Sequence, residues 1–177
     1  MKSLFVTALL ACTLFAAPVN RGLLNTVETS MNKRIRALNP TEEFLLLGLT
    51  HGVYLEGYGC VFTATVNLAE GPGISPFRQQ VPEPERAALR KKKLERLPAL
   101  RDAMREMLVN AAGVMDPVPT EEKLVMAVKL FHHPHEDSTG LPAQIVMQAP
   151  RRTLLSFQTQ SRDKSAMLVG ILSKESF

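Results

Sequence analysis

The chain has 177 residues, of which 45% are hydrophobic and 21% are charged, and these are the proportions of an ordinary globular protein. Its 21 basic and 17 acidic residues give a formal net charge of +4, an excess too small to indicate a dedicated nucleic-acid-binding protein. The length favours a single domain that buries a core without help from disulfides or a structural metal. The composition therefore indicates a globular domain and does not indicate a particular activity or ligand.

The N-terminal residues 1–17, MKSLFVTALLACTLFAA, have the layout of a secretory signal peptide. One lysine precedes an apolar stretch that is too short for a comfortable transmembrane helix, and small residues follow it. We therefore expect an exported protein, periplasmic or extracellular, whose signal is removed. As an alternative, Leu9-Leu10-Ala11-Cys12 resembles a bacterial lipobox that is cut before Cys12, which would make the protein a membrane-anchored lipoprotein. An uncleaved anchor is a third alternative.

Removal of the signal would leave Cys60 as the only cysteine of the mature chain, so no internal disulfide can form. Cys60 begins a segment in which apolar and mixed positions alternate up to Leu68, which is the pattern of a strand with one buried face. Because Cys60 belongs to the apolar set, we expect a buried and unreactive thiol.

Two segments have the apolar periodicity of a helix. Leu23, Val27, Met31 and Ile35 follow one another at four-residue steps, and Asn39-Pro40 should end this first helix. A longer helix is predicted from about Glu85 to Ala112. Pro98 lies within it and should kink it or divide it into two helices.

Four segments are predicted to be strands. Residues 44–49 are a continuous apolar run, typical of a strand buried on both faces, and His51-Gly52 and residues 56–59 have the composition of turns. Residues 60–68 form the second strand. Residues 124–131 are apolar at both alternating sets of positions, which indicates a central strand, and residues 143–149 would be its partner, with Pro150 ending it.

The order of these elements predicts an α+β domain that covers residues 18–160. Its sheet would be antiparallel, with about four strands in two hairpins, a long kinked helix between the hairpins and the N-terminal helix packed on the sheet. Residues 161–177 would form a C-terminal extension whose structure the pattern leaves open.

A cluster of histidines and acids, residues 132–137, contains ligand types that suit zinc. Adjacent His132 and His133 would point to opposite faces of a strand, whereas His133 and His135 could share a side, with Asp137 closing a site from the turn. The competing interpretation is a polar hairpin loop that happens to be rich in histidine.

A second candidate site is basic. Arg86, Arg90, Lys91, Lys92 and Lys93 crowd the start of the long helix. In a straight helix, Arg86, Arg90 and Lys93 share the azimuth that Leu97, Leu100 and Met104 later use for the core. We therefore expect the first turns to project past the sheet into water, where they could contact an anionic envelope component or an acidic protein. A solvated helix start, balanced by neighbouring glutamates, is the alternative.

The Pro/Gly-rich loop that follows the second predicted strand places Ile74 and Phe77 in an exposed connection, which is a third candidate contact surface. No nucleophile elbow, HExxH helix or phosphate-binding loop is present, and no pair of carboxylates suggests an acid and a base. The sequence therefore offers no catalytic residues.

Three stretches together resemble an uncharacterised family of exported bacterial proteins, a domain of unknown function: Gly52-Val53-Tyr54-Leu55 through Leu68, Ser75-Pro76-Phe77, and Leu94-Glu95-Arg96-Leu97-Pro98 onward. The resemblance covers roughly residues 40–155. It implies no activity and carries over no catalytic residues.

These features predict an exported envelope domain that is not an enzyme and needs no cofactor. It would work by binding or assembly, through the basic helix start, with an unknown protein or an anionic envelope component as its partner. Nucleic acid is excluded as a partner, and a membrane is involved only if Cys12 is lipidated. The alternative is a small metal-dependent hydrolase that uses zinc bound by His133, His135 and Asp137.

Overall fold

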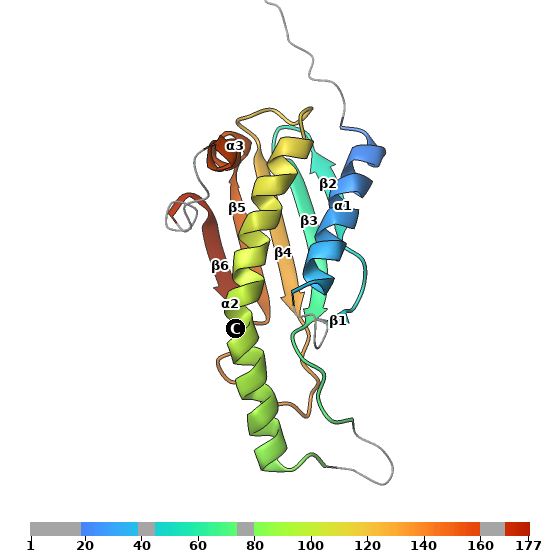
Figure 1. Ribbon diagram of the computed structural model, residues 1–177, viewed down its shortest axis with the longest axis vertical. Helices are drawn as coiled ribbons and strands as arrows, with labels where there is room; N and C mark the ends of the chain where they lie inside the picture. Colours follow the sequence, from blue (N-terminus) through green and yellow to red (C-terminus); the bar gives the residue numbers. More distant parts are fainter. Residues whose placement is uncertain (1–18, 39–44, 74–79, 160–168) are drawn as a thin grey trace, which may run out of the picture.

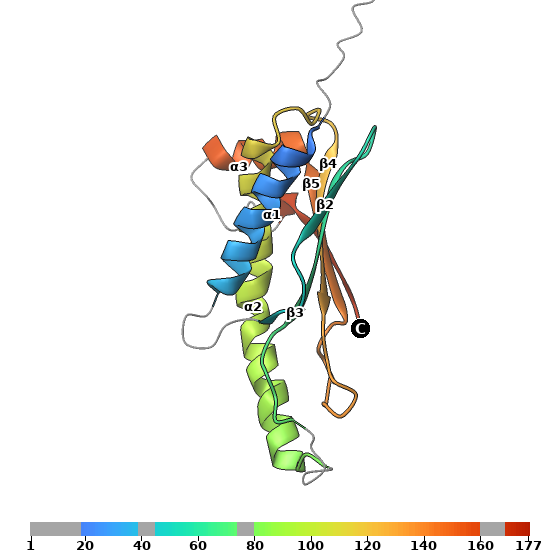
Figure 2. The same cartoon turned by 90° about the vertical axis from the view of Figure 1, so that its right-hand side faces the viewer.

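A computed structural model describes residues 19–38, 45–73, 80–159 and 169–177 of the chain. These residues form an α+β domain in two layers, with helices on one face of a mixed sheet (Figures 1 and 2). The elements in chain order are α1 (Arg21–Arg36), β1 (Leu45–Leu46), β2 (His51–Leu55), β3 (Gly59–Asn67), α2 (Glu83–Val114), β4 (Lys123–Leu130), β5 (Gln144–Pro150), α3 (Arg151–Thr159) and β6 (Leu172–Ser176).

The strands follow the order β1-β3-β4-β5-β6, and β2 pairs with β3 alongside β1. The second predicted hairpin is present as the antiparallel pair β4–β5, and the first is present in part, because both β1 and β2 pair antiparallel with β3. The prediction of a wholly antiparallel sheet is wrong, because β3 and β4 are parallel at its centre. The reason is the connection: α2 carries the chain back along the sheet, so that β4 starts at the same end as β3.

The first hairpin differs from its prediction in position. The apolar run at 44–49 contributes only the short strand β1, and Leu47 and Leu49 are about half exposed. His51 and Gly52, predicted as a turn, lie inside β2. The cause is tertiary: Asn32 and Glu28 of α1 accept the backbone N–H groups of Thr50 (2.8 Å) and Gly52 (2.7 Å), which orders the chain along β3 beneath the helix.

The helix α2 runs without interruption through Pro98, so a division into two helices is wrong. Proline removes one intrahelical hydrogen bond. Pro98 lies on the exposed side of α2, away from the buried positions Leu97 and Leu100 that hold both halves of the helix on the same layer.

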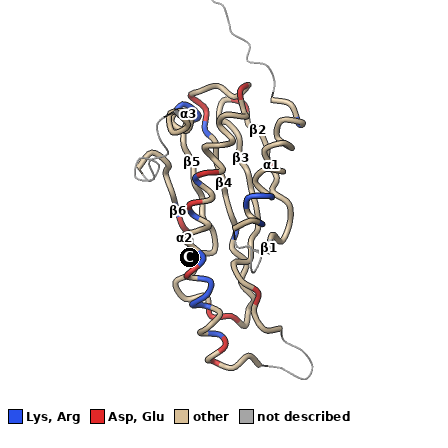
Figure 3. Tube along the Cα trace, in the orientation of Figure 1, with Lys and Arg blue, Asp and Glu red and all other residues tan. Residues whose placement is uncertain are grey.

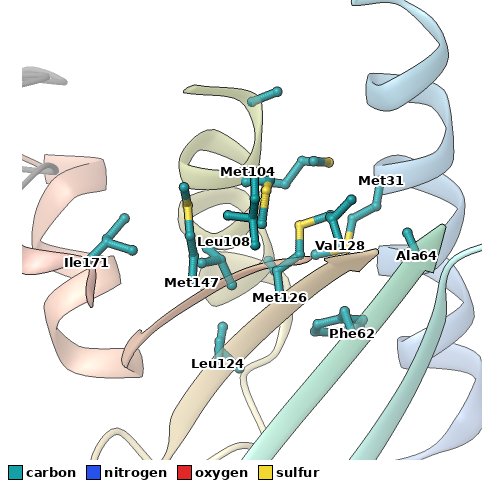
Figure 4. Close-up of a cluster of buried hydrophobic side chains, with 14 of the residues drawn as sticks. Met31, Phe62, Ala64, Met104, Leu108, Leu124, Met126, Val128, Met147 and Ile171 are labelled. Atoms are coloured by element: carbon teal, nitrogen blue, oxygen red, sulfur yellow. The ribbon is translucent and has the colours of Figure 1, made fainter. Parts of the chain in front are cut away.

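The core lies between the sheet and the helices and is rich in methionine (Figure 4). Methionine fills irregular gaps well because its side chain is unbranched and flexible. The buried set includes Met31 of α1, three methionines in and after α2, and one in each of β4 and β5: Met104, Met107, Met115, Met126 and Met147. Ile171 and β6, from the stretch whose structure the sequence left open, belong to this core and to the sheet.

Among the described residues, no helix combines the length and the apolar character that crossing a membrane requires.

Candidate functional site

The basic half of α2 extends past the end of the sheet, as the sequence predicted (Figures 1 and 3). It does not stand free in water, because chain segments next to the sheet pack against it. Arg96 donates to the backbone oxygen of Leu68 (2.6 Å), and Leu89 lies so close to Gly71 that a Cβ at that glycine would overlap it. The loop between β4 and β5 covers the same half of α2.

A buried ion pair joins this half of α2 to the β4–β5 loop. The ammonium of Lys93 contacts the carboxylate of Glu136, and the two side chains are only 1% and 3% exposed. Lys93 also donates to the backbone oxygen of Phe131 (3.5 Å). A charge so far from water is stable only when it is paired, so Lys93 and Glu136 neutralise each other. The ion pair thus joins the two candidate sites found in the sequence, the basic helix start and the cluster of histidines and acids at residues 132–137.

The other basic residues of the helix start are only partly available. Arg90 donates to the backbone oxygen of Thr139 (2.6 Å) and lies 3.6 Å from Asp137, and Arg86 pairs with Glu83 one turn earlier. The expectation that Arg86, Arg90 and Lys93 face open water is therefore corrected. Of the five predicted contact residues, only Lys91 is exposed. Three are half-buried (Arg86, Arg90 and Lys92), and Lys93 is buried.

The histidines of the β4–β5 loop do not gather around a common point. The rings of His133 and His135 stack with centroids 5.1 Å apart, while the carboxylate of Asp137 accepts the backbone N–H of Thr139 (2.9 Å). In the part of the chain that the structure describes, which includes these three residues, no group of three His, Cys, Asp or Glu side chains could hold a metal ion. His133 and His135 contact each other, whereas Asp137 contacts Thr139.

His132 is the histidine nearest the buried ion pair. Its Nε2 lies 3.3 Å from the backbone oxygen of Pro142, and its Nδ1 lies 4.0 Å from the carboxylate of Glu136. Burial lowers the pKa of His132 below its ordinary value, and the charge of Lys93 lowers it further. The imidazole is therefore neutral at pH 7, so the loop carries one buried negative charge, that of Glu136, against the one positive charge of Lys93.

Cys60 is completely buried on the core side of β3, which confirms the prediction from the sequence. Burial raises the pKa of its thiol to about 12, so the thiolate needed for a nucleophile or a metal ligand does not form at neutral pH. Cys12, Ile74 and Phe77 lie outside the described residues.

The opposite face of the sheet, which we call the open face, is the main uncommitted surface. All described helices lie on the core side, and none covers this face (Figure 2). The strand pairings align one row of side chains across it: Val53 of β2, Val61 of β3, Val125 of β4, Gln148 of β5 and Leu172 of β6. Val53 and Leu172, at the two ends, are 50% and 62% exposed.

The next row consists of His51, Thr63, Ala127, Val146 and Lys174, and it is apolar only at its centre, at Ala127 and Val146. A shallow hollow of about 690 Å³ begins at this row and extends toward Leu47, Leu49 and Lys129. The charges of the face share one sign. They come from Lys123, Lys129 and Lys174, and the acid of β6, Glu175, points to the core side, where Arg101 of α2 binds it with both nitrogens (2.6 and 2.9 Å).

The size of the open face is in the range of protein interfaces. Five strand positions about 4.8 Å apart and about seven residues at roughly 3.3 Å each give roughly 550 Å². Covering it would bury about 1,100 Å² over both partners, which passes the roughly 1,000 Å² expected of a specific interface.

Comparisons of the chain with protein families, with curated proteins and with solved structures find no match. The resemblance to a family of exported proteins therefore stays a prediction, and the function must be inferred from the chain itself.

The sequence held one signal of the open face. Residues 124–131 are apolar at both alternating sets of positions, which predicted that β4 is a central strand. The structure confirms that β4 is central, but the described helices cover only the set that starts at Leu124. The other set, from Lys123 to Lys129, faces away from the helices, with Val125, which is only 5% exposed, and the half-buried Ala127 at its middle.

Proposed function

We propose that this protein is a non-catalytic binding domain of the cell envelope, and that its open face docks a partner protein. The observation that carries the proposal is the row from Val53 to Leu172, which places apolar side chains on most strands of a face that no described helix covers. Apolar side chains gathered on an exposed face mark a site of protein–protein contact. A partner that packs on this face would cover these side chains.

The partner should have an apolar centre and an acidic margin. Lys129 and Lys174 flank the apolar rows, and no acid of the described strands faces the same way. A second copy of the chain docked on the same face would set two positively charged faces against each other, which costs free energy rather than supplying it. Carboxylates on a different protein would complement them, so a heterologous partner is favoured over self-association.

The basic helix start is a weaker candidate for the contact surface. Lys93 is neutralised by Glu136, and Arg90 is bound to the β4–β5 loop. An anionic envelope component would meet chiefly Lys91, and one exposed lysine supplies little binding free energy. Export through the N-terminal residues 1–17 remains part of the proposal and rests on the sequence pattern alone. The metal-dependent hydrolase has no support in the arrangement of His133, His135 and Asp137.

Site-specific photocrosslinking in the cells that produce the protein would test the docking surface. A photoreactive amino acid replaces Val53 or Leu172 at the two ends of the apolar row, and, as matched controls, Lys91 or Glu95 on the exposed side of α2. We expect one crosslinked species of the same mass from both sheet positions and none from the helix. The combined substitution Lys129→Glu and Lys174→Glu should abolish it, because an acidic margin would then be repelled.

Other outcomes would contradict the proposal in defined ways. Crosslinks from Lys91 and Glu95 alone would move the contact to the basic helix. A product of twice the chain mass would indicate self-association. No product from Val53 or Leu172 would show that the open face has no stable partner, and an acidic margin would be refuted if the double charge reversal left the product unchanged.

A further inference from the structure

The helical layer contains a groove between α1 and α2. Its volume is about 380 Å³, near the lower end of the roughly 300–1,000 Å³ that small-molecule sites occupy. On α1 its lining extends from Thr26 to Ala37, which at 1.5 Å per residue is about 16 Å. The two helices that form it lie on the side of the sheet opposite the open face, so the groove is independent of the proposed docking surface (Figure 2).

The floor of the groove is apolar. Val27 and Met31 of α1 and Met107 and Ala111 of α2 line it, and each of these side chains also belongs to the core. The hollow exists because small residues stand where larger ones would fill the space between the helices: Ser30, Ala37 and Ala111. Val114 is 40% exposed at one end, which leaves an apolar surface open to a ligand.

The other end of the groove is basic. The last turn of α1 carries Lys33, Arg34 and Arg36, and the first two line the groove. Glu106 of α2 neutralises Arg34 through a 2.7 Å ion pair. Lys33 is exposed and forms no ion pair with a described residue, so its ammonium is available beside an apolar channel.

We propose that this groove binds a single-chain anionic amphiphile, with its carboxylate at Lys33 and its hydrocarbon chain along Met31, Met107 and Ala111. Charge complementarity selects an anion at this end, and the apolar floor selects a hydrocarbon tail. A groove of about 16 Å matches an extended chain of about twelve carbons, and its volume admits one such chain rather than the two of a membrane lipid.

Titration of the full-length protein, purified without detergent, with monomeric dodecanoate would test this inference. We expect saturable binding of one dodecanoate, with the uncharged dodecanol binding more weakly. Lys33→Glu should lower the affinity for dodecanoate about 10-fold or more, because it replaces an ion pair by a repulsion, and it should leave dodecanol unaffected. Lys91→Glu, the same charge change on the exposed side of α2, is the control and should change neither affinity.

A second variant fills the groove instead of changing its charge. Ser30 is exposed at the rim, so Ser30→Trp should abolish binding of both ligands while the circular dichroism spectrum stays that of the folded protein. If Ser30→Trp unfolds the chain, Val114→Trp makes the same test from the α2 side.

The inference is overturned if dodecanoate shows no saturable binding, or if Ser30→Trp or Lys33→Glu leaves its affinity unchanged. It is also overturned if the protein sediments with phosphatidylglycerol vesicles but fails to bind monomeric dodecanoate, since the basic end would then serve a membrane surface.

Discussion

The buried pair of Lys93 and Glu136 gives the sharpest prediction for stability. Both side chains are almost fully buried, and they join positions 43 residues apart in the chain. Replacing either residue by methionine, which is similar in length, would leave the other charge in the protein interior without its counterion. We expect Lys93→Met and Glu136→Met each to lower the free energy of unfolding by about 3–5 kcal/mol.

The double variant, Lys93→Met with Glu136→Met, distinguishes the cost of an unpaired buried charge from the loss of the ion pair itself. With both positions occupied by methionine, no charge remains buried at this site and two apolar side chains replace the ion pair. We expect the double variant to be more stable than either single variant by about 2 kcal/mol or more. Urea unfolding followed by circular dichroism measures all three differences, since the midpoint and slope give the free energy of unfolding.

An exposed pair on the same helix is the control. Arg86 and Glu83 are one turn apart with side chains 41% and 67% exposed, and Glu83→Gln should cost less than about 1 kcal/mol. The reasoning is refuted if Lys93→Met or Glu136→Met costs no more than this control, or if the double variant loses the sum of the single losses. Either result would mean that water reaches the pair.

Three further predictions concern single residues. Gly59 has φ +126°, and a Cβ there would overlap the backbone oxygen of Lys123, so Gly59→Ala should lower the free energy of unfolding in urea by about 3 kcal/mol or more. Gly57 has φ +78° with open space around it, so Gly57→Asn should lower the free energy of unfolding by less than about 1 kcal/mol. The lowered pKa of His132 means that the unfolded chain binds more protons below pH 6.5, so stability falls from pH 7 to pH 5, and His132→Asn should flatten that slope. Because Cys60 is completely buried, its labelling by a thiol reagent at pH 8 should be as slow as global unfolding, and rapid labelling would show that β3 opens locally.

Much of the fold follows from local pattern. The four-residue steps from Leu23 to Ile35 predicted α1 within two residues at each end, and the alternation that starts at Cys60 predicted β3 and the burial of its thiol. These predictions succeed because an element with one apolar stripe buries that stripe in the core, and the period of the stripe distinguishes a helix from a strand. A helix long enough to span the sheet connects the second and third predicted strands, and this connection by itself favours the parallel pair β3–β4.

Other elements depend on partners far along the chain. The strand β6, with the sequence LSKES, has no apolar alternation, and it is held by pairing with β5 and by the bond from Arg101 to Glu175. The strand β2 contains Gly52, which reads locally as a turn residue, and its place is set by Glu28 of α1. No window around either strand contains the group that stabilises it.

The candidate sites show the same division. The sequence by itself determined that basic residues and a cluster of histidines and acids exist, and that Lys93 falls on the core-facing side of α2. Only the tertiary structure decided that Glu136 meets Lys93, since an ion pair depends on distance in space and not along the chain. It also decided that the outward side of β4 is left uncovered, because the described helices all pack on one face of the sheet. The sequence shows that both sides of β4 are apolar, but it does not show which of the two sides lacks a second layer.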